Sequence, residues 1–118
     1  MKAIRIDGFG GPEVLNLADV PDPSPGPGQV VARVEAAGLN IIDVYHRTGL
    51  YPNPLPLVPG MEGAGVVAAL GAGVSLFRVG DRVAWANVLG SYAERVALPA
   101  DRAVALPAGI DTRTAAAL

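Results

Sequence analysis

The first half of the chain contains side chains that can form hydrogen bonds or stack on a flat ring, among them Asn40, Tyr45 and Tyr51. A carboxamide both donates and accepts hydrogen bonds, and a phenol donates to an oxygen atom and offers a ring face for stacking. Tyr51 is the most suggestive of the three, because it stands in a proline-rich loop where an aromatic side chain has little structural purpose.

The same spacing also fits purely structural roles. Asn40 can cap a helix, and Asp43 at the third helical position is favoured by the helix dipole. Tyr45 shares a helical face with Ile41 and Val44, so it also fits a core position. Asp43 and Arg47, four residues apart, can form a surface ion pair that contributes only ~0.3–0.5 kcal/mol.

The sequence contains few residues that could bind a metal ion or act as a thiol. The chain has no cysteine, which excludes disulfides, thiol catalysis and zinc sites built on cysteine within these residues. The single histidine, His46, has no second histidine beside it. We therefore expect His46 to lie on the surface of a helix rather than in a metal site.

One segment matches the pattern of a nucleotide-binding motif but lacks the structural context that the motif requires. Residues 63–68 (GAGVVA) fit the pattern G-x-G-x-x-A, and Asp81 follows at a suitable distance. The dinucleotide fingerprint requires a strand before it and a helix after it. Here a proline-rich loop precedes the motif, and Gly71 and Gly73 would break a helix. We interpret 63–68 as part of a strand whose glycines allow another backbone to come close.

Length and composition indicate one compact domain. The chain has 118 residues, 51% of them hydrophobic and 17% charged, which excludes intrinsic disorder. With a net charge of −2, the sequence lacks the overall basic character that is typical of proteins that bind nucleic acid. Residues 63–77 form an uncharged run shorter than the ~20 residues of a membrane-spanning helix. The N-terminus lacks a secretory signal, so we expect a soluble, cytoplasmic protein that binds neither nucleic acid nor membrane.

The elements that must position these side chains are mostly strands. Fifteen glycines and eleven prolines are typical of short strands joined by turns. A helix is expected between Asn40 and Gly49, and a second helix begins after its cap at Asp111. Phe77 and Trp85 are expected in the core. Apolar segments bounded by turn residues, with clear alternation at 15–20 and 29–37, predict about seven strands, near 2–7, 15–20, 29–37, 64–70, 82–85, 92–98 and 103–106. Together they predict a mainly β, partly open barrel with one or two short helices.

Several motifs, taken in order, resemble one family. They are FGGPEVL (9–15), GLN followed by Asp43 (38–43), RTGLYP (47–52), and GAGVV with VGDRV (63–67 and 79–83). This arrangement resembles the medium-chain dehydrogenase/reductase superfamily, and within it the zinc-independent NADPH:quinone oxidoreductases of the zeta-crystallin type. The resemblance implies that residues 1–110 are a GroES-like catalytic, substrate-binding domain. Residues 111–118 would begin the helix that leads to a Rossmann domain not present in this chain.

Two positions depart from the zinc-dependent branch of that superfamily. Asn40 stands where the alcohol dehydrogenases place a zinc-binding cysteine, and Met61 stands where they place a zinc-binding histidine. An amide and a thioether are poor zinc ligands, so no metal is expected. Glu62 is expected as a buried carboxylate, a remnant of the zinc surroundings that would pair with an arginine of the missing domain.

The resemblance implies hydride transfer from NADPH to a quinone. In this hypothesis Asn40, Tyr45 and Tyr51 are catalytic residues lining the cleft. Asn40, Asp43 and Tyr45 serve the nicotinamide cofactor, with Asp43 orienting its neighbours. The full-length protein would be a homodimer, and these 118 residues alone would be inactive.

Two other functions stay open at this point. One is an enoyl or alkenal reductase of the same superfamily, in which Tyr45 or Tyr51 would act as general acid. The other is a stand-alone GroES-like binding module. The proline-stiffened 50–60 loop disfavours that module, because a ring-forming relative of GroES needs a mobile apolar loop.

Overall fold

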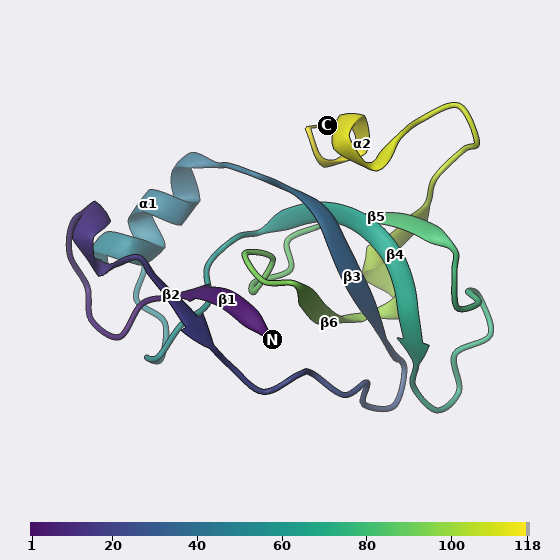
Figure 1. Cartoon of the computed structure of the whole chain (residues 1–118), viewed down its shortest axis with the longest axis horizontal. Helices are drawn as coiled ribbons and strands as arrows, with labels where there is room; N and C mark the ends of the chain where they lie inside the picture. Colours follow the sequence, from purple (N-terminus) through teal and green to yellow (C-terminus); the bar gives the residue numbers. More distant parts are fainter. Residues whose placement is uncertain (118) are drawn as a thin grey trace.

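The computed structural model describes residues 1–117, which form two antiparallel sheets and two short α-helices (Figure 1). Single turns of 3₁₀ helix lie at Pro12–Val14 and Ala100–Arg102. The helices are α1 (Ile41–Thr48) and α2 (Thr112–Ala116). The strands are β1 (Lys2–Arg5), β2 (Asn16–Asp19), β3 (Gln29–Gly38), β4 (Glu62–Leu70), β5 (Arg82–Ala86), β6 (Arg95–Pro99) and β7 (Ala103–Ala105).

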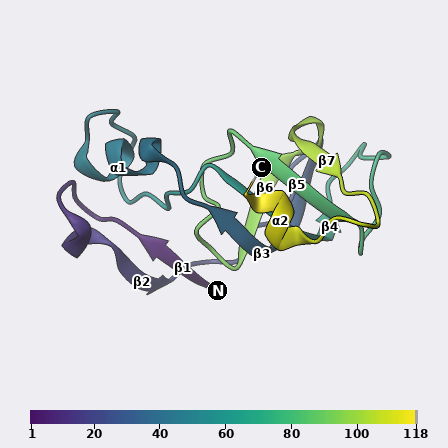
Figure 2. The same cartoon turned by 90° about the horizontal axis from the view of Figure 1, so that it is seen from above.

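The larger sheet has five strands in the order β6-β3-β4-β5-β7, and every neighbouring pair is antiparallel. Strands β6 and β7 are its two edges in the described chain, so the sheet does not close on itself. Figure 2 shows α1 with the β1–β2 pair at one end of the molecule and α2 over the larger sheet. The predicted mainly β, partly open barrel is confirmed.

The main core is formed by side chains of the larger sheet together with side chains of the segments that connect its strands. Phe77 and Trp85 are both buried in it, as predicted. The indole Nε1 of Trp85 donates to the Oγ of Ser91 at 2.9 Å, which satisfies a polar group that would otherwise be buried without a partner. Their fully buried neighbours are Val30, Ala32, Val67, Val83 and Leu98.

The GAGVVA segment lies within β4, which confirms that it is not a cofactor-binding turn. Gly65 pairs with Val34 of the neighbouring β3. A Cβ atom at Gly65 would overlap the carbonyl oxygen of Arg33, so only glycine allows the two strands to come this close.

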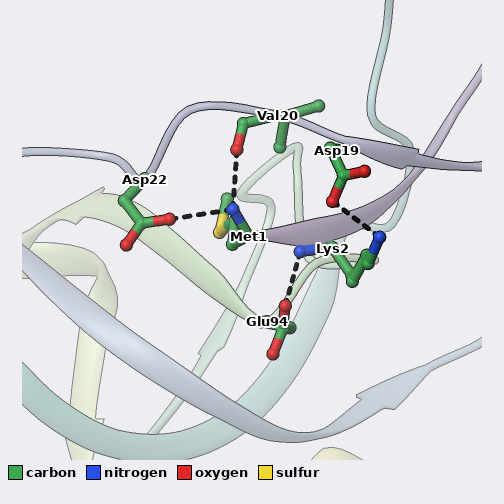
Figure 3. A network of polar contacts seen from close by, with 6 residues as sticks. All are labelled: Met1, Lys2, Asp19, Val20, Asp22 and Glu94. Atoms are coloured by element: carbon green, nitrogen blue, oxygen red, sulfur yellow. Dashed lines mark hydrogen bonds and ion pairs between the residues drawn. The ribbon is translucent and has the colours of Figure 1, made fainter.

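Polar contacts of the first two residues connect the β1–β2 sheet to the larger sheet (Figure 3). The Met1 ammonium donates to the Val20 carbonyl at 2.8 Å and to the Asp22 carboxylate at 2.9 Å. The backbone N–H of Lys2 donates to Glu94, which immediately precedes β6. These contacts join β1, the segment after β2 and the approach to β6.

The predicted strand boundaries agree with the structure to within three residues, and two of the differences have an identifiable cause. The first strand ends at Arg5, and Ile6 instead forms an isolated bridge with Leu57 of the proline-rich loop. The strand predicted from Tyr92 begins only at Arg95. The reason is that the Tyr92 backbone N–H donates to the Pro59 carbonyl and Ala93 forms an isolated bridge with Ala3 of β1. The chain therefore lies against that loop and β1 before it pairs with β3.

The two helix starts are correctly predicted. Helix α1 begins after Asn40 and ends before Gly49. Helix α2 begins after Asp111, whose carboxylate accepts from the Thr114 backbone N–H at 2.7 Å. The last residue of the predicted segment 111–118 lies outside the described residues. No helix among residues 1–117 combines the length and apolar character needed to cross a membrane.

Candidate active site

A hollow of about 350 Å³ opens where the start of α1, the start of β4 and the end of β5 meet. Its walls are mixed, with aliphatic side chains beside two carboxamides and one carboxylate. The lining residues are Asn40, Ile41, Ile42, Met61, Glu62, Ala86 and Asn87. The structure thus brings Asn40, the first of the predicted site residues, next to Met61 and Glu62.

Asn40 is held at both its backbone and its side chain. It is the N-cap of α1, with extended backbone angles, and forms a capping box with Asp43. Its Nδ2 donates to the Oε1 of Glu62 at 2.9 Å. One N–H of the carboxamide is therefore committed to Glu62, and this fixes which end of the amide faces β4.

Asp43 is buried, with 5% of its surface exposed. Its Oδ2 accepts two hydrogen bonds, from the Asn40 backbone N–H at 3.0 Å and from the Tyr92 hydroxyl at 2.6 Å. Arg47 does not pair with it, because the Arg47 Nε donates to the Gly10 carbonyl at 3.2 Å. The alternative of a surface ion pair between Asp43 and Arg47 is therefore wrong.

The Tyr92 hydroxyl is an unusually weak acid in this environment. Burial raises its pKa well above the ordinary value, and the hydrogen bond to Asp43 and the charges of Asp43 and Glu62 raise it further. Tyr92 therefore keeps its proton and acts as a hydrogen-bond donor over the working pH range.

The orientation of α1 contradicts two predictions. His46 is buried, with 6% of its surface exposed, so its predicted position on the helix surface is wrong. Ile41 is 69% exposed, so the predicted apolar face does not face inward at this position. The helix buries the side that carries Asp43 and His46, because that side meets Tyr92 and the N-terminal segment rather than an apolar sheet.

Tyr45 and Tyr51 lie together but outside the lining of the hollow. Their rings meet edge to face, with centroids 5.3 Å apart and planes at 79°. Tyr45 is half-buried and lies one helical turn beyond Ile41, which lines the hollow. Tyr51 is exposed. The pair therefore lies further along the exposed side of α1 from the hollow.

Two residues of this region were not predicted from the sequence. Asn87 lines the hollow, and its φ of +59° places it in the left-handed region. Asparagine adopts this conformation several-fold more often than most other residues apart from glycine. Tyr92 contacts Asp43, which lies 49 residues earlier in the sequence, and no local sequence pattern predicts such a contact.

Comparison with known proteins identifies the domain. Residues 26–108 match the model of the alcohol dehydrogenase GroES-like domain. The chain belongs to this family. The GroES-like fold predicted from the sequence motifs is thereby confirmed.

The relatives of this GroES-like domain are much longer than the chain itself. A quinone oxidoreductase of Pseudomonas aeruginosa is 50% identical over 99% of this chain and 37% of its own length. A synaptic vesicle membrane protein VAT-1 homolog of Rattus norvegicus is 45% identical over 100% of this chain and 30% of its own length. The structure of Escherichia coli quinone oxidoreductase complexed with NADPH is 40% identical, with a TM-score of 0.95 over 98% of this chain and 36% of that one. The chain spans about a third of the length of these relatives.

The donor atoms of the hollow do not fit zinc. Zinc has to be considered for an alcohol dehydrogenase GroES-like domain, because the zinc-dependent members bind their metal with cysteine and histidine. Here the hollow offers an amide at Asn40, a thioether at Met61 and one carboxylate at Glu62. Within residues 1–117, no three His, Cys, Asp or Glu residues come together in a way that could hold a metal ion.

Proposed function

We propose that this GroES-like domain is the substrate-binding part of an enzyme that uses NADPH to reduce a quinone without a metal. The observation that carries the proposal is the hollow itself. It combines a fixed carboxamide with aliphatic walls, and it lacks the donors that zinc chemistry requires. The similarity to quinone oxidoreductases, one of them complexed with NADPH, supports the choice of substrate and cofactor.

Asn40 is the residue we propose to contact the substrate carbonyl. One N–H of its carboxamide is bonded to Glu62, and the second N–H has no acceptor among residues 1–117, so it can donate to a carbonyl oxygen. The bond to Glu62 prevents the amide from rotating, so this donor is oriented before the substrate arrives. Ile41, Ile42 and Ala86 supply apolar walls for a flat ring.

Tyr45 and Tyr51 extend this surface beyond the hollow. We propose that their edge-to-face pair packs against the part of the substrate or nicotinamide that projects along α1. Asp43 acts indirectly in this proposal. It is buried and bonded to the Asn40 backbone, so it orients Asn40 and thereby serves the cofactor side of the site.

Quinone reduction suits a site with these groups. NADPH, when bound, would supply a hydride, and one proton from water would complete the two-electron reduction of the quinone to a hydroquinone. A quinone is already electron-poor, so the chain only has to hold the quinone ring in the orientation that hydride transfer requires. An alcohol or a simple ketone would need a stronger polarising group than one amide N–H.

The experiment is an acceptor panel with the full-length protein that contains this chain. NADPH oxidation is measured with a quinone, an enone and a simple ketone. We expect kcat/KM for the quinone to exceed the other two, and Asn40→Ala to lower it roughly 10²-fold, as loss of an oriented donor typically does. Asn16→Ala is the matched control, since Asn16 lies on β2 and donates only locally, to Val14.

Two outcomes would contradict the proposal. A preference for the enone, abolished by substitution of Tyr45 or Tyr51 with phenylalanine, would indicate an enoyl or alkenal reductase. No NADPH oxidation with any acceptor would leave the domain as a binding module. A homodimer is also proposed, and sedimentation of the full-length protein measures it directly.

A further inference from the structure

We propose that Tyr92 is a positioning residue of this site, which orients Asn40 through the carboxylate of Asp43. The inference rests on the proposed function for its kinetic consequence, but its structural part is independent of the substrate. Tyr92 lies in the loop before β6 and does not line the hollow. Its effect on the reaction would therefore be transmitted through the start of α1.

The backbone around Tyr92 is tightly fixed. Its N–H donates to the Pro59 carbonyl at 3.0 Å, and its carbonyl accepts from the Ile4 N–H at 2.8 Å. Gly60, at φ +97°, packs directly against the Tyr92 ring, and a Cβ there would lie 2.6 Å from a ring carbon. The ring is thus anchored by β1 and by the segment that leads into β4.

The Tyr92 hydroxyl supplies one of the two hydrogen bonds that Asp43 accepts. The other comes from the Asn40 backbone N–H, and both end on the same oxygen, Oδ2. The second oxygen, Oδ1, is buried and has no hydrogen-bond partner among the described residues. Without the Tyr92 hydroxyl, a buried carboxylate would keep a single donor, which is an unfavourable arrangement.

This contact determines where Asn40 sits. The capping-box bond from Asn40 to Asp43 holds the first turn of α1, and the Tyr92 bond ties that turn to the rest of the domain. The Asn40 side chain is tied separately to Glu62 at the start of β4. The distance between α1 and β4 therefore depends on Tyr92, and a shift of about 1 Å can cost a large factor in rate.

The test compares Tyr92→Phe with Ser91→Ala in the full-length protein. Ser91 is the adjacent residue, is buried, and loses a hydrogen bond of similar kind, from Trp85 Nε1. It has no bond to α1 in the described structure, so it controls for a general loss of stability. Three quantities are measured: kcat for a quinone, KM for that quinone, and amide hydrogen exchange of peptides covering residues 40–48.

For Tyr92→Phe we expect kcat to fall about tenfold with KM changed less than twofold, because orientation rather than binding is lost. Exchange in residues 40–48 should be faster than in the wild type. Ser91→Ala should leave both kcat and exchange in 40–48 unchanged. Equal effects of the two variants, or no effect of Tyr92→Phe, would overturn the proposal.

A second comparison covers the case in which Tyr92→Phe does not fold. Asp43→Asn keeps an oxygen that can accept both hydrogen bonds, and its own kcat, whatever its value, is the reference for this comparison. The double variant Y92F/D43N has no unpaired buried charge, and we expect the same tenfold loss relative to Asp43→Asn. A double variant as active as Asp43→Asn would refute the role of the hydroxyl.

The two proposals can fail separately. If the wild-type protein reduces no quinone, the proposed function is wrong, whereas hydrogen exchange in residues 40–48 still decides whether Tyr92 positions α1. If quinone reduction is present but Tyr92→Phe leaves exchange and kcat unchanged, only the role of Tyr92 is wrong.

Discussion

Replacing Gly65 with alanine should destabilise the domain far more than a one-carbon change usually does. Gly65 lies in β4 opposite Val34, and the new Cβ would overlap the Arg33 carbonyl oxygen and lie 3.1 Å from the Val34 Cα. These are backbone atoms, which cannot rotate away, so β3 and β4 must separate locally. Overpacking of this kind costs ~1–3 kcal/mol, and each weakened ladder hydrogen bond adds ~0.5–1.5 kcal/mol.

The expected total is about 3 kcal/mol, which corresponds to roughly 10–20 °C in Tm for a domain of this size. Thermal and urea unfolding of Gly65→Ala measure it directly. Gly109→Ala is the matched control, because a Cβ at Gly109 meets no atom within 4 Å. If the free energies of unfolding of Gly65→Ala and Gly109→Ala differ by less than about 0.5 kcal/mol, β3 and β4 do not approach as closely as described.

Three further predictions concern the core, helix α2 and the chain by itself. Leu98→Ala should cost ~2–5 kcal/mol in urea unfolding, since Leu98 is fully buried on β6; a cost below 1 kcal/mol would contradict that burial. Hydrogen bonds from Thr114 lower the pKa of Asp111, so its contribution to α2 is present above the ordinary aspartate pKa of 3.8 and is lost as pH falls through the lower folded value. Amide exchange of residues 112–117 should therefore rise on acidification and, after correction for intrinsic exchange, should not do so in Asp111→Ala. The 118-residue chain should oxidise no NADPH with a quinone, and measurable turnover would refute this.

The sequence predicts the elements well where the signal is local. Alternation predicts β3, and the Gly-Ala-Gly turn at 71–73 marks the end of β4. Asn40, Gly49 and Asp111 mark helix ends because capping is decided by a few neighbouring residues. The GAGVVA segment is correctly assigned to a strand, since a fingerprint without a following helix cannot present an N-terminus to a phosphate.

The candidate site is predicted less completely, because its contacts are long-range. Periodicity assigns the apolar side of α1 to the core, but the helix buries Asp43 and His46 instead. That arrangement depends on Tyr92, which comes from a distant loop and gives Asp43 a donor. The side chain of Ile41 is exposed because it lines the hollow, and the sequence does not predict that hollow.

The absence of a metal requirement is the central claim, and it is tested most directly in the purified full-length protein. Quinone reduction with NADPH is measured before and after exhaustive chelation, together with the zinc content per protomer. We predict an unchanged rate and substoichiometric zinc, because Asn40 and Met61 cannot replace thiolate and imidazole ligands. One zinc per protomer, with activity lost on chelation and restored by zinc, would contradict the account.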